Sequence, residues 1–209
     1  MRISELSKRS GVPVATLKFY IREGLLPRGE AVSATNAEYG EEHLARVRLI
    51  AALADVRGLP LSRVREILAL IDEPAPDPVE TLGRAVGALP PYVEEADDYP
   101  RAREAIEHAG LTYEPRFAAV RQLDSAIRAI EDAGLRWNPS VLSRYADAMR
   151  AVAGEEVAPV AEMTLQDAVV YAVLGTALYE PVMLALRRLA HHHLLVSGAV
   201  PPPTESAAD

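Results

Sequence analysis

The sequence from residue 2 to residue 27 reads Arg2-Ile-Ser-Glu-Leu-Ser-Lys-Arg-Ser-Gly-Val-Pro-Val-Ala-Thr-Leu-Lys-Phe-Tyr-Ile-Arg-Glu-Gly-Leu-Leu-Pro27, and it predicts two short helices joined by a glycine turn. Ser4 is a suitable N-cap for the first helix, and Val12-Pro13 follows Gly11 and opens the second helix with an early proline. Gly24 ends the second helix, and an extended apolar hook follows it. These features together predict a helix-turn-helix.

Outward from this unit, the sequence predicts a small wing and two more helices. Residues 28–39 are rich in small polar residues between short apolar pieces, which is typical of a two-stranded hairpin with a loose tip. A third helix is expected from Glu41 to Arg57, and a fourth begins near Pro60. The prolines of residues 73–78 form a stiff linker that no helix crosses. We therefore expect one domain at 1–72 and a second at 79–196.

The second half of the chain shows helical periodicity throughout, with helices expected near 79–89, 92–98, 100–110, 116–134, 140–153 and 164–195. The predicted fold class is therefore mainly α: an N-terminal winged helix-turn-helix with a small two-stranded wing, followed by an all-helical C-terminal domain. Residues 197–209 contain three consecutive prolines and small polar residues, so we expect a disordered tail.

Charge is distributed unevenly along the chain, whose net charge is −8. Residues 1–28 hold six basic and two acidic side chains, a net +4, whereas residues 73–209 hold 11 basic and 21 acidic side chains, a net −10. A basic first segment on an acidic body indicates that phosphate would bind at the N-terminal end of the molecule.

Several function classes are excluded or disfavoured by composition. The chain has no cysteine, which excludes disulfides, thiolate metal sites and thiol redox switches. Residues 191–193 are three consecutive histidines, but neighbours on a helix point about 100° apart and cannot chelate one ion together, so we expect no metal and no cofactor. No catalytic motif is recognised, and an enzyme is not expected. The absence of a signal-peptide pattern favours a cytoplasmic protein.

Residues 2–27 closely resemble the opening of MerR-family regulators. The resemblance continues through Tyr39-Gly-Glu-Glu-His-Leu-Ala-Arg-Val-Arg-Leu-Ile50 and Gly58-Leu-Pro-Leu-Ser-Arg-Val-Arg-Glu-Ile-Leu68, in family order and spacing. It implies a winged helix-turn-helix regulator that binds double-stranded promoter DNA as a homodimer. Family members act on promoters with an overlong spacer and distort the DNA to realign the polymerase elements, so RNA polymerase would be an indirect partner.

The second helix carries donors that suit major-groove recognition, because Thr16, Lys18, Tyr20 and Arg22 can reach base edges and phosphates. By resemblance, Lys18 occupies the family's usual arginine position and Tyr20 offers its hydroxyl to a phosphate. Basic residues at the start of the wing and in the third helix could add backbone contacts; a solvated surface side chain is the alternative for each arginine, including Arg48. The predicted DNA-binding residues are Val14, Ala15, Thr16, Lys18, Phe19, Tyr20, Arg22, Arg28 and Arg46.

The sequence departs from the family pattern at the wing and at the dimer contact. The usual glycine-tyrosine-arginine becomes Thr35-Asn36-Ala37, so the wing arginine is missing, and Gly40 replaces a serine or threonine cap. The family's long coiled-coil helix would begin where the linker prolines stand, so the dimer contact must be built differently.

We expect Met163 to Leu186 to be a buried helix rather than a membrane span, and we expect the final helix to form the dimer interface. The plan of this C-terminal domain is weakly similar to that of TetR-type regulators.

Most of the aromatic residues lie beyond residue 90, and together with aliphatic walls they suit a pocket for a small hydrophobic or cationic ligand. The same residues would also suit an ordinary helical core. Residues 105–115 recur as residues 129–139 with seven of eleven positions identical, either as a reused helix-capping sequence or as two aromatic hooks that frame one cavity. Glu180 would bind a cationic ligand or pair with Arg187 or Arg188. The candidate ligand-binding residues are Tyr92, Tyr113, Phe117, Trp137, Tyr145, Tyr171, Tyr179 and Glu180.

The alternative function is that of an architectural or partner-docking DNA-binding protein, in which the helical domain serves only for dimerisation and binds no ligand.

Overall fold

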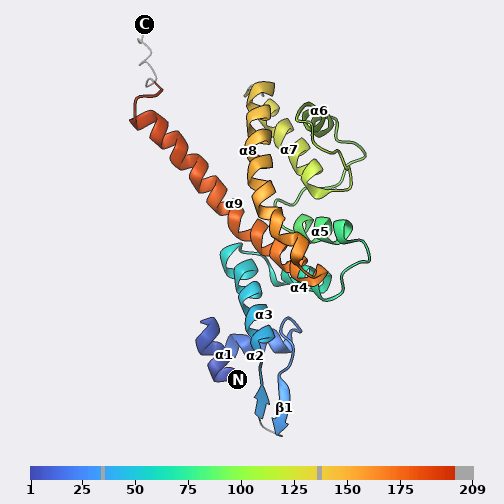
Figure 1. The fold of residues 1–209 in the computed structure, drawn as a ribbon, viewed down its shortest axis with the longest axis vertical. Coiled ribbons are helices and arrows are strands. Elements are labelled where there is room, and N and C mark those ends of the chain that lie inside the picture. The colour runs from blue at the N-terminus through green and yellow to red at the C-terminus, as the bar shows by residue number, and fades with distance from the viewer. Residues whose placement is uncertain (34–35, 136–137, 201–209) are drawn as a thin grey trace.

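The computed structural model describes residues 1–33, 36–135 and 138–200 (Figure 1). The N-terminal part, which we call the head (residues 1–72), contains helices α1 (Ile3–Ser10) and α2 (Val14–Arg22), a wing of strands β1 (Glu30–Ser33) and β2 (Asn36–Glu38), and helices α3 (Glu41–Ala51) and α4 (Leu61–Asp72). The wing is antiparallel, with Glu30 opposite Glu38. The winged helix-turn-helix predicted from the sequence is confirmed.

Local backbone conformation explains the short connections between the helices and the wing of the head. Gly11 ends α1 at φ 75°, a left-handed conformation that glycine adopts without steric cost. The helix that begins at Glu41 passes into a π-helical turn, η1 (Ala52–Val56), before Gly58 reverses the chain. The N-terminal amine donates a hydrogen bond of 2.7 Å to the carbonyl oxygen of Tyr39, which joins the start of the chain to the end of the wing.

The remaining part, which we call the body, is entirely helical within the described residues. It contains α5 (Pro78–Gly87), α6 (Pro100–His108), α7 (Ala118–Asp132), α8 (Pro139–Val157), a 3-10 turn η2 (Ala158–Glu162) and α9 (Leu165–Val196). The prediction of a helix at residues 92–98 was wrong. Tyr99 precedes Pro100, which disfavours helical backbone at the residue before it, and the Tyr99 hydroxyl accepts a hydrogen bond of 3.1 Å from the Ala96 amide. Of the expected disordered tail, residues 197–200 form a turn and residues 201–209 lie outside the described residues.

The head and the body share one hydrophobic core. Val169, Val173 and Ala177 of α9 are fully buried in the same cluster as Leu53 of η1 and Ala85 of α5. A second, smaller core joins α6 and α7 around Ile106 and Val120. Because α9 packs directly on η1, α4 and α5, contact between head and body is not limited to the proline-rich linker.

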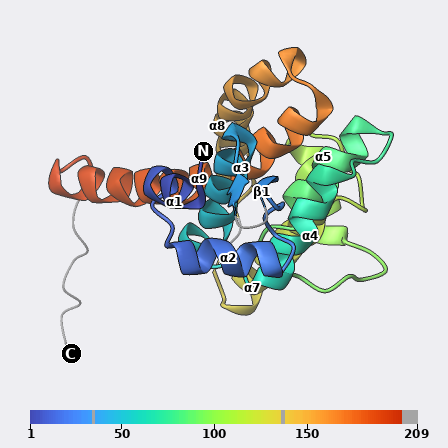
Figure 2. The same ribbon diagram turned by 90° about the horizontal axis from the view of Figure 1, so that it is seen from below.

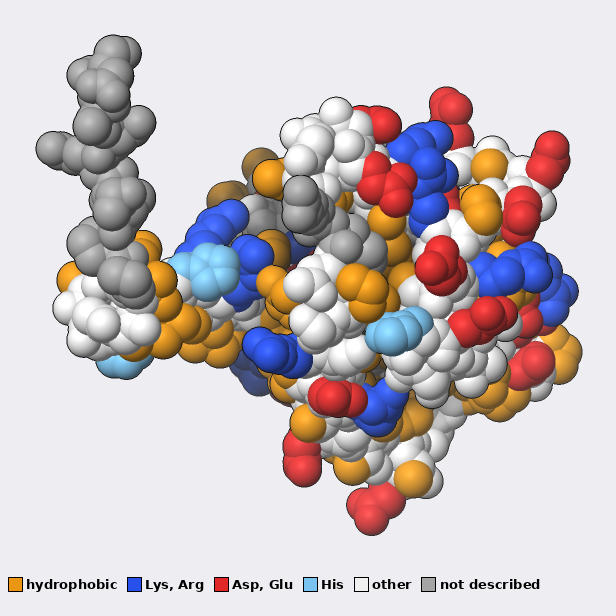
Figure 3. Space-filling model, turned by 90° about the horizontal axis from the view of Figure 1, so that it is seen from above, with side chains coloured by type: hydrophobic (Ala, Val, Ile, Leu, Met, Phe, Trp, Pro, Cys, Tyr) orange, Lys and Arg blue, Asp and Glu red, His pale blue; other side chains and the backbone are white. Residues whose placement is uncertain are grey.

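The last helix is only partly buried, which corrects the expectation that it lies inside the protein. Its first half packs on the head, but every residue from 184 to 196 is exposed. We call residues 179–196 the arm; it projects away from the other helices (Figures 1 and 2) and carries apolar side chains along its surface (Figure 3). Leu165–Val196 is long and apolar enough to cross a membrane by length and composition. Its most apolar window of 18 residues has a mean hydropathy of 1.7, and 17% of that window is buried.

Candidate nucleic-acid interface

Helix α2 presents one face to the core and the other to solvent. Leu17 is fully buried and Tyr20 is 5% exposed, whereas Ala15, Lys18 and Arg22 are exposed. These three exposed residues are three and four positions apart, so they lie on one side of the helix. Thr16, Phe19 and Val14 are half-buried at the edges of this face. The helix-turn-helix therefore leaves the second helix open along the side that carries its lysine.

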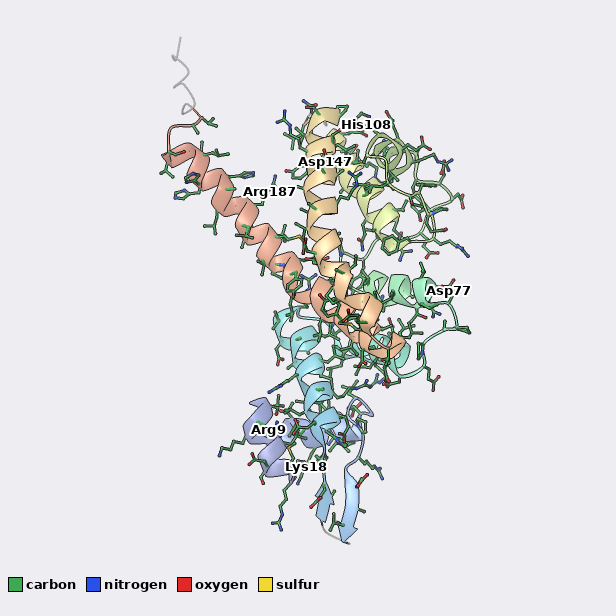
Figure 4. The ribbon with its side chains drawn as sticks, viewed as in Figure 1. Arg9, Lys18, Asp77, His108, Asp147 and Arg187 are labelled. Carbon is green, nitrogen blue, oxygen red and sulfur yellow. The ribbon has the colours of Figure 1, made fainter. Side chains whose placement is uncertain are left out.

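A hollow of about 420 Å³ lies beside α2, between the start of α1 and the end of the wing. Lys18 stands on its wall, and Figure 4 shows this side chain at the end of the molecule where the wing lies. The first amides of a helix have no partner within the helix and attract anions, and Arg2 makes no side-chain cap at the start of α1. The hollow is lined by Arg2, Ile3, Ser4, Lys18, Ile21, Ala37 and Tyr39.

This hollow combines two cationic side chains with a helix N-terminus, which is an arrangement suited to a phosphate group. Sequence reasoning missed Arg2 and Ser4 as candidates for this interface. The available signal was a basic residue directly before a helix whose first turn has no serine or aspartate cap, since Ser4 lies inside the helix rather than before it.

Two predicted DNA-binding residues, Tyr20 and Arg46, are largely buried in the head and not exposed on its surface as expected. The Tyr20 ring belongs to the head core, and burial raises the pKa of its hydroxyl. Arg46 donates to both carboxylate oxygens of Asp72 at 2.8 and 2.6 Å and to the carbonyl oxygen of Leu25 at 3.0 Å, with only 13% of its side chain exposed. The Arg46 guanidinium joins α3, α4 and the hook after α2, so it braces the head rather than facing outward.

Arg22, at the end of α2, and Arg28, between α2 and the wing, lie at the surface. Arg22 is exposed, lies 5.2 Å from the centre of the Phe19 ring and is 3.6 Å from the Glu23 carboxylate. Arg28 is exposed directly before the wing, and Arg48 is exposed on α3. The wing tip at residues 34–35 lies outside the described residues, so the expected loss of wing contacts stays a prediction.

Residues 1–71 match the family model described as "MerR HTH family regulatory protein". Residues 1–71 are therefore a MerR-family helix-turn-helix domain. The chain is 36% identical over 72 residues to the mercuric resistance operon regulatory protein of Serratia marcescens and 33% identical over 70 residues to the HTH-type transcriptional regulator ZntR homolog of Haemophilus influenzae. These matches cover 34% of this chain and 49% and 51% of the two relatives, so the chain spans about half the length of the curated relatives it matches.

The likeness to one solved structure extends beyond this MerR-family head. The crystal structure of the "putative transcriptional regulator SCO5550" from Streptomyces coelicolor A3(2) is 31% identical in sequence and superposes with a TM-score of 0.74. The match covers 98% of this chain and 100% of that chain. The helical body is therefore part of the shared architecture and not an addition unique to this protein.

The candidate ligand-binding aromatics of the body do not converge on one cavity. Tyr92 lies 4.8 Å from the Arg63 guanidinium, Tyr113 lies 4.7 Å from Arg103, and the Tyr145 hydroxyl accepts a hydrogen bond of 3.0 Å from Arg187. These three pairs lie on different elements. Phe117 and Tyr179 are exposed, Tyr171 is half-buried, and Trp137 lies outside the described residues. The repeat therefore does not show two hooks around one site within the described chain.

A different part of the body is hollowed. A space of about 360 Å³ lies between α6, α7 and α8, and none of the predicted aromatics lines it. Its walls combine carboxylates with aliphatic groups, and His108 stands at its edge on α6 (Figure 4). Sequence reasoning missed this site, although the spacing of Arg101, Glu104, Ala105 and His108 places them on one face of a helix. The full lining is Arg101, Glu104, Ala105, His108, Ile127, Glu131, Pro139 and Leu142.

The expected partner of Glu180 was also wrong. Glu180 pairs with Arg57, at the end of η1 in the MerR-family head, and the two side chains are 2.7 Å apart. Burial raises the pKa of Glu180, and the attraction of Arg57 opposes that rise. Among the described residues, the Arg57 Nε atom is buried without a hydrogen-bond partner. This ion pair joins the head to α9 at the point where the arm begins.

Arg57→Gln and Glu180→Gln are each expected to destabilise the protein. Each change leaves one partly buried charge without its counter-charge, although the glutamine can still form a hydrogen bond with the remaining partner. We expect a loss of about 1–3 kcal/mol for Arg57→Gln, which corresponds to a fall in Tm of roughly 2–12 °C for a chain of this size. Thermal unfolding followed by circular dichroism measures both variants, and an equal, negligible change in both would contradict a stabilising role of the pair.

Proposed function

We propose that this MerR-family protein is a sequence-specific transcriptional regulator that binds promoter DNA as a homodimer. The basic hollow beside the exposed face of α2 carries the proposal, because it places two cations and a helix N-terminus next to a helix suited to the major groove. The acidic body would repel DNA, so the head is the part that approaches it.

Within this proposal, the residues of α2 have distinct roles. Lys18 binds a backbone phosphate at the hollow as a point charge, together with Arg2 and Ser4. Val14, Ala15 and Thr16 lie in the N-terminal turn of α2, which is the part of a recognition helix that approaches base edges. Arg22 and Arg28 flank this face, and Phe19 supports Arg22. Tyr20 and Arg46 position the helix from inside the head and do not bind DNA.

Fluorescence anisotropy with a palindromic promoter fragment tests the proposal. Binding by phosphate contacts releases counterions, so the logarithm of the affinity should fall linearly with the logarithm of salt concentration. A specific site should also bind at least about a thousandfold more tightly than scrambled DNA of equal length. Binding that is insensitive to salt, or equal for both fragments, would overturn the proposal.

We further propose that the body responds to a small organic ligand with hydrophobic and cationic groups. The hollow between α6, α7 and α8 supports this, since Glu104 offers negative charge beside the aliphatic Ile127 and Leu142. Glu131, on the same wall, is paired with Arg101 at 2.6 Å. A series of alkylamines of increasing length, measured by thermal shift, should raise Tm in the wild-type protein and less in Glu104→Gln. If no amine stabilises the protein, the helical body serves dimerisation and partner docking alone.

A further inference from the structure

The start of α3 is capped by a histidine inside the helix. Gly40, the residue before the helix, has no side chain that could accept a hydrogen bond from the first amides. The Nδ1 atom of His43, three residues later, accepts a hydrogen bond of 3.0 Å from the Gly40 amide. Glutamate or glutamine commonly makes this contact. Histidine differs from both because its charge changes between pH 5 and pH 8.

The same nitrogen of His43 has a second neighbour that requires the opposite protonation state. Nδ1 lies 2.7 Å from an oxygen of the Glu42 carboxylate. The Gly40 amide needs a lone pair on Nδ1, whereas a charged carboxylate at this distance needs a proton there. Nδ1 therefore satisfies one neighbour at a time. Gly40 leaves room for this arrangement, since a Cβ atom at residue 40 would collide with both carboxylate oxygens of Glu42.

The charge of the His43 ring decides which neighbour is satisfied. The neutral ring with its proton on Nε2 accepts from Gly40, whereas the cationic ring donates from Nδ1 to Glu42. A hydrogen bond from its own backbone amide and the contact with His43 lower the pKa of Glu42, so this carboxylate remains charged. Only 7% of the His43 side chain is exposed, and its Nε2 atom is buried without a partner among the described residues. Both states leave the Nε2–H group unpaired, so they differ in their hydrogen bonds only at Nδ1.

The bond between Gly40 and His43 lies directly behind the basic hollow of the head. Tyr39, which precedes Gly40, lines this hollow, and its ring meets the His43 ring edge-on with the centres 5.2 Å apart. The Tyr39 backbone also exchanges hydrogen bonds of 2.7 and 2.8 Å with Met1, the neighbour of Arg2. Loss of the Gly40 bond would therefore loosen the wall that holds Arg2 across the hollow from Lys18.

We infer that His43 is a pH-dependent cap, which holds the basic hollow in its DNA-binding shape when neutral and releases it when protonated. The inference rests on the proposed DNA-binding function and names a regulator of the same site. Glu42 is the only charged side chain at ion-pair distance from the ring within the described part of the chain. The charged groups of the neighbouring elements have partners of their own: Arg9 of α1 pairs with Glu41, Asp72 of α4 pairs with Arg46, and the N-terminal amine bonds to Tyr39.

An NMR titration of the full-length chain between pH 8 and pH 5 tests the cap. His43 is the only histidine of the head, and its signals are identified by their loss in His43→Gln. At pH 8 the ring should carry its proton on Nε2, and the ring and the Gly40 amide should change with one common midpoint as the pH falls. Glu42→Gln should move this midpoint to lower pH, because the carboxylate favours the charged ring. A proton on Nδ1 at pH 8, or a Gly40 amide that does not respond, would overturn the inference.

DNA anisotropy with His43→Gln tests the regulatory effect, because glutamine can accept the same bond from Gly40 but does not titrate. Between pH 8 and pH 5.5, the affinity of the wild-type protein should fall at least about threefold more than that of the variant, near the lower end for the loss of a helix cap. An equal change in both proteins overturns the regulation and leaves DNA binding intact. Binding that is insensitive to salt at pH 8 overturns the proposed function and the regulatory role with it, while the ring titration still decides whether His43 caps α3.

Discussion

Lys18→Ala is expected to weaken DNA binding by at least about tenfold, the loss that corresponds to one charge-assisted contact of ordinary strength. Lys18 is exposed on α2 at the wall of the basic hollow, and alanine preserves the helix while removing the cation. The slope of affinity against salt should also fall, by about one for each protomer that loses a phosphate contact. Anisotropy titrations at several salt concentrations measure both quantities.

Lys8→Ala is the matched control for this prediction. Lys8 is the only other lysine in the chain; it is exposed near the end of α1 and does not line the hollow. The control removes the same charge from the same head, so it should change the affinity much less and leave the slope nearly unchanged. A similar loss in both variants would show that the total charge of the head determines binding and that the hollow does not.

Val173→Asp is expected to unfold or strongly destabilise the whole protein. Val173 is fully buried in the core that joins α9 to the head, and a carboxylate there would lose its hydration without gaining a cation. We expect a cost of about 3 kcal/mol or more, and a fall in Tm of at least about 6 °C. Because the core is shared, the circular dichroism and DNA-binding signals should be lost together as temperature rises.

Val182→Asp is the matched control, because it makes the same substitution in the same helix two and a half turns later. Val182 is 51% exposed on the arm, so this variant should keep its fold and nearly all of its Tm. Circular dichroism should show the helical content and thermal transition of the wild-type protein in this variant. If Val173→Asp were as well tolerated as Val182→Asp, the shared core of head and body would be contradicted.

Much of the head was predictable from the sequence because its signals are local. Gly11, Gly24 and Gly58 end helices through their own backbone conformations, and Leu44, Val47 and Ile50 recur at helical spacing along a buried face. The alternation of helix, turn and wing follows from these residues and a few neighbours. Resemblance to the MerR family, confirmed for residues 1–71, rests on the same local pattern.

The partners of individual charged and aromatic side chains were less predictable, because they depend on residues far apart in the chain. Arg46 is a surface cation by local sequence, but in the fold it pairs with Asp72, 26 positions away. Glu180 had two nearby arginines as plausible partners but pairs with Arg57, 123 positions away. The aromatics looked like one pocket by number and type, yet their arginine partners hold them at separate places.

The sequence by itself determined the MerR-type head, the wing and the helical character of the body, since each follows from periodicity, capping and turn chemistry over short distances. Only the tertiary structure showed that α9 is divided into a half buried on the head and an exposed arm. Composition could not show this division, because both halves are apolar. The division depends on where the neighbouring helices end: η1, α4 and α5 cover the first half of α9, whereas every residue from 184 to 196 is exposed.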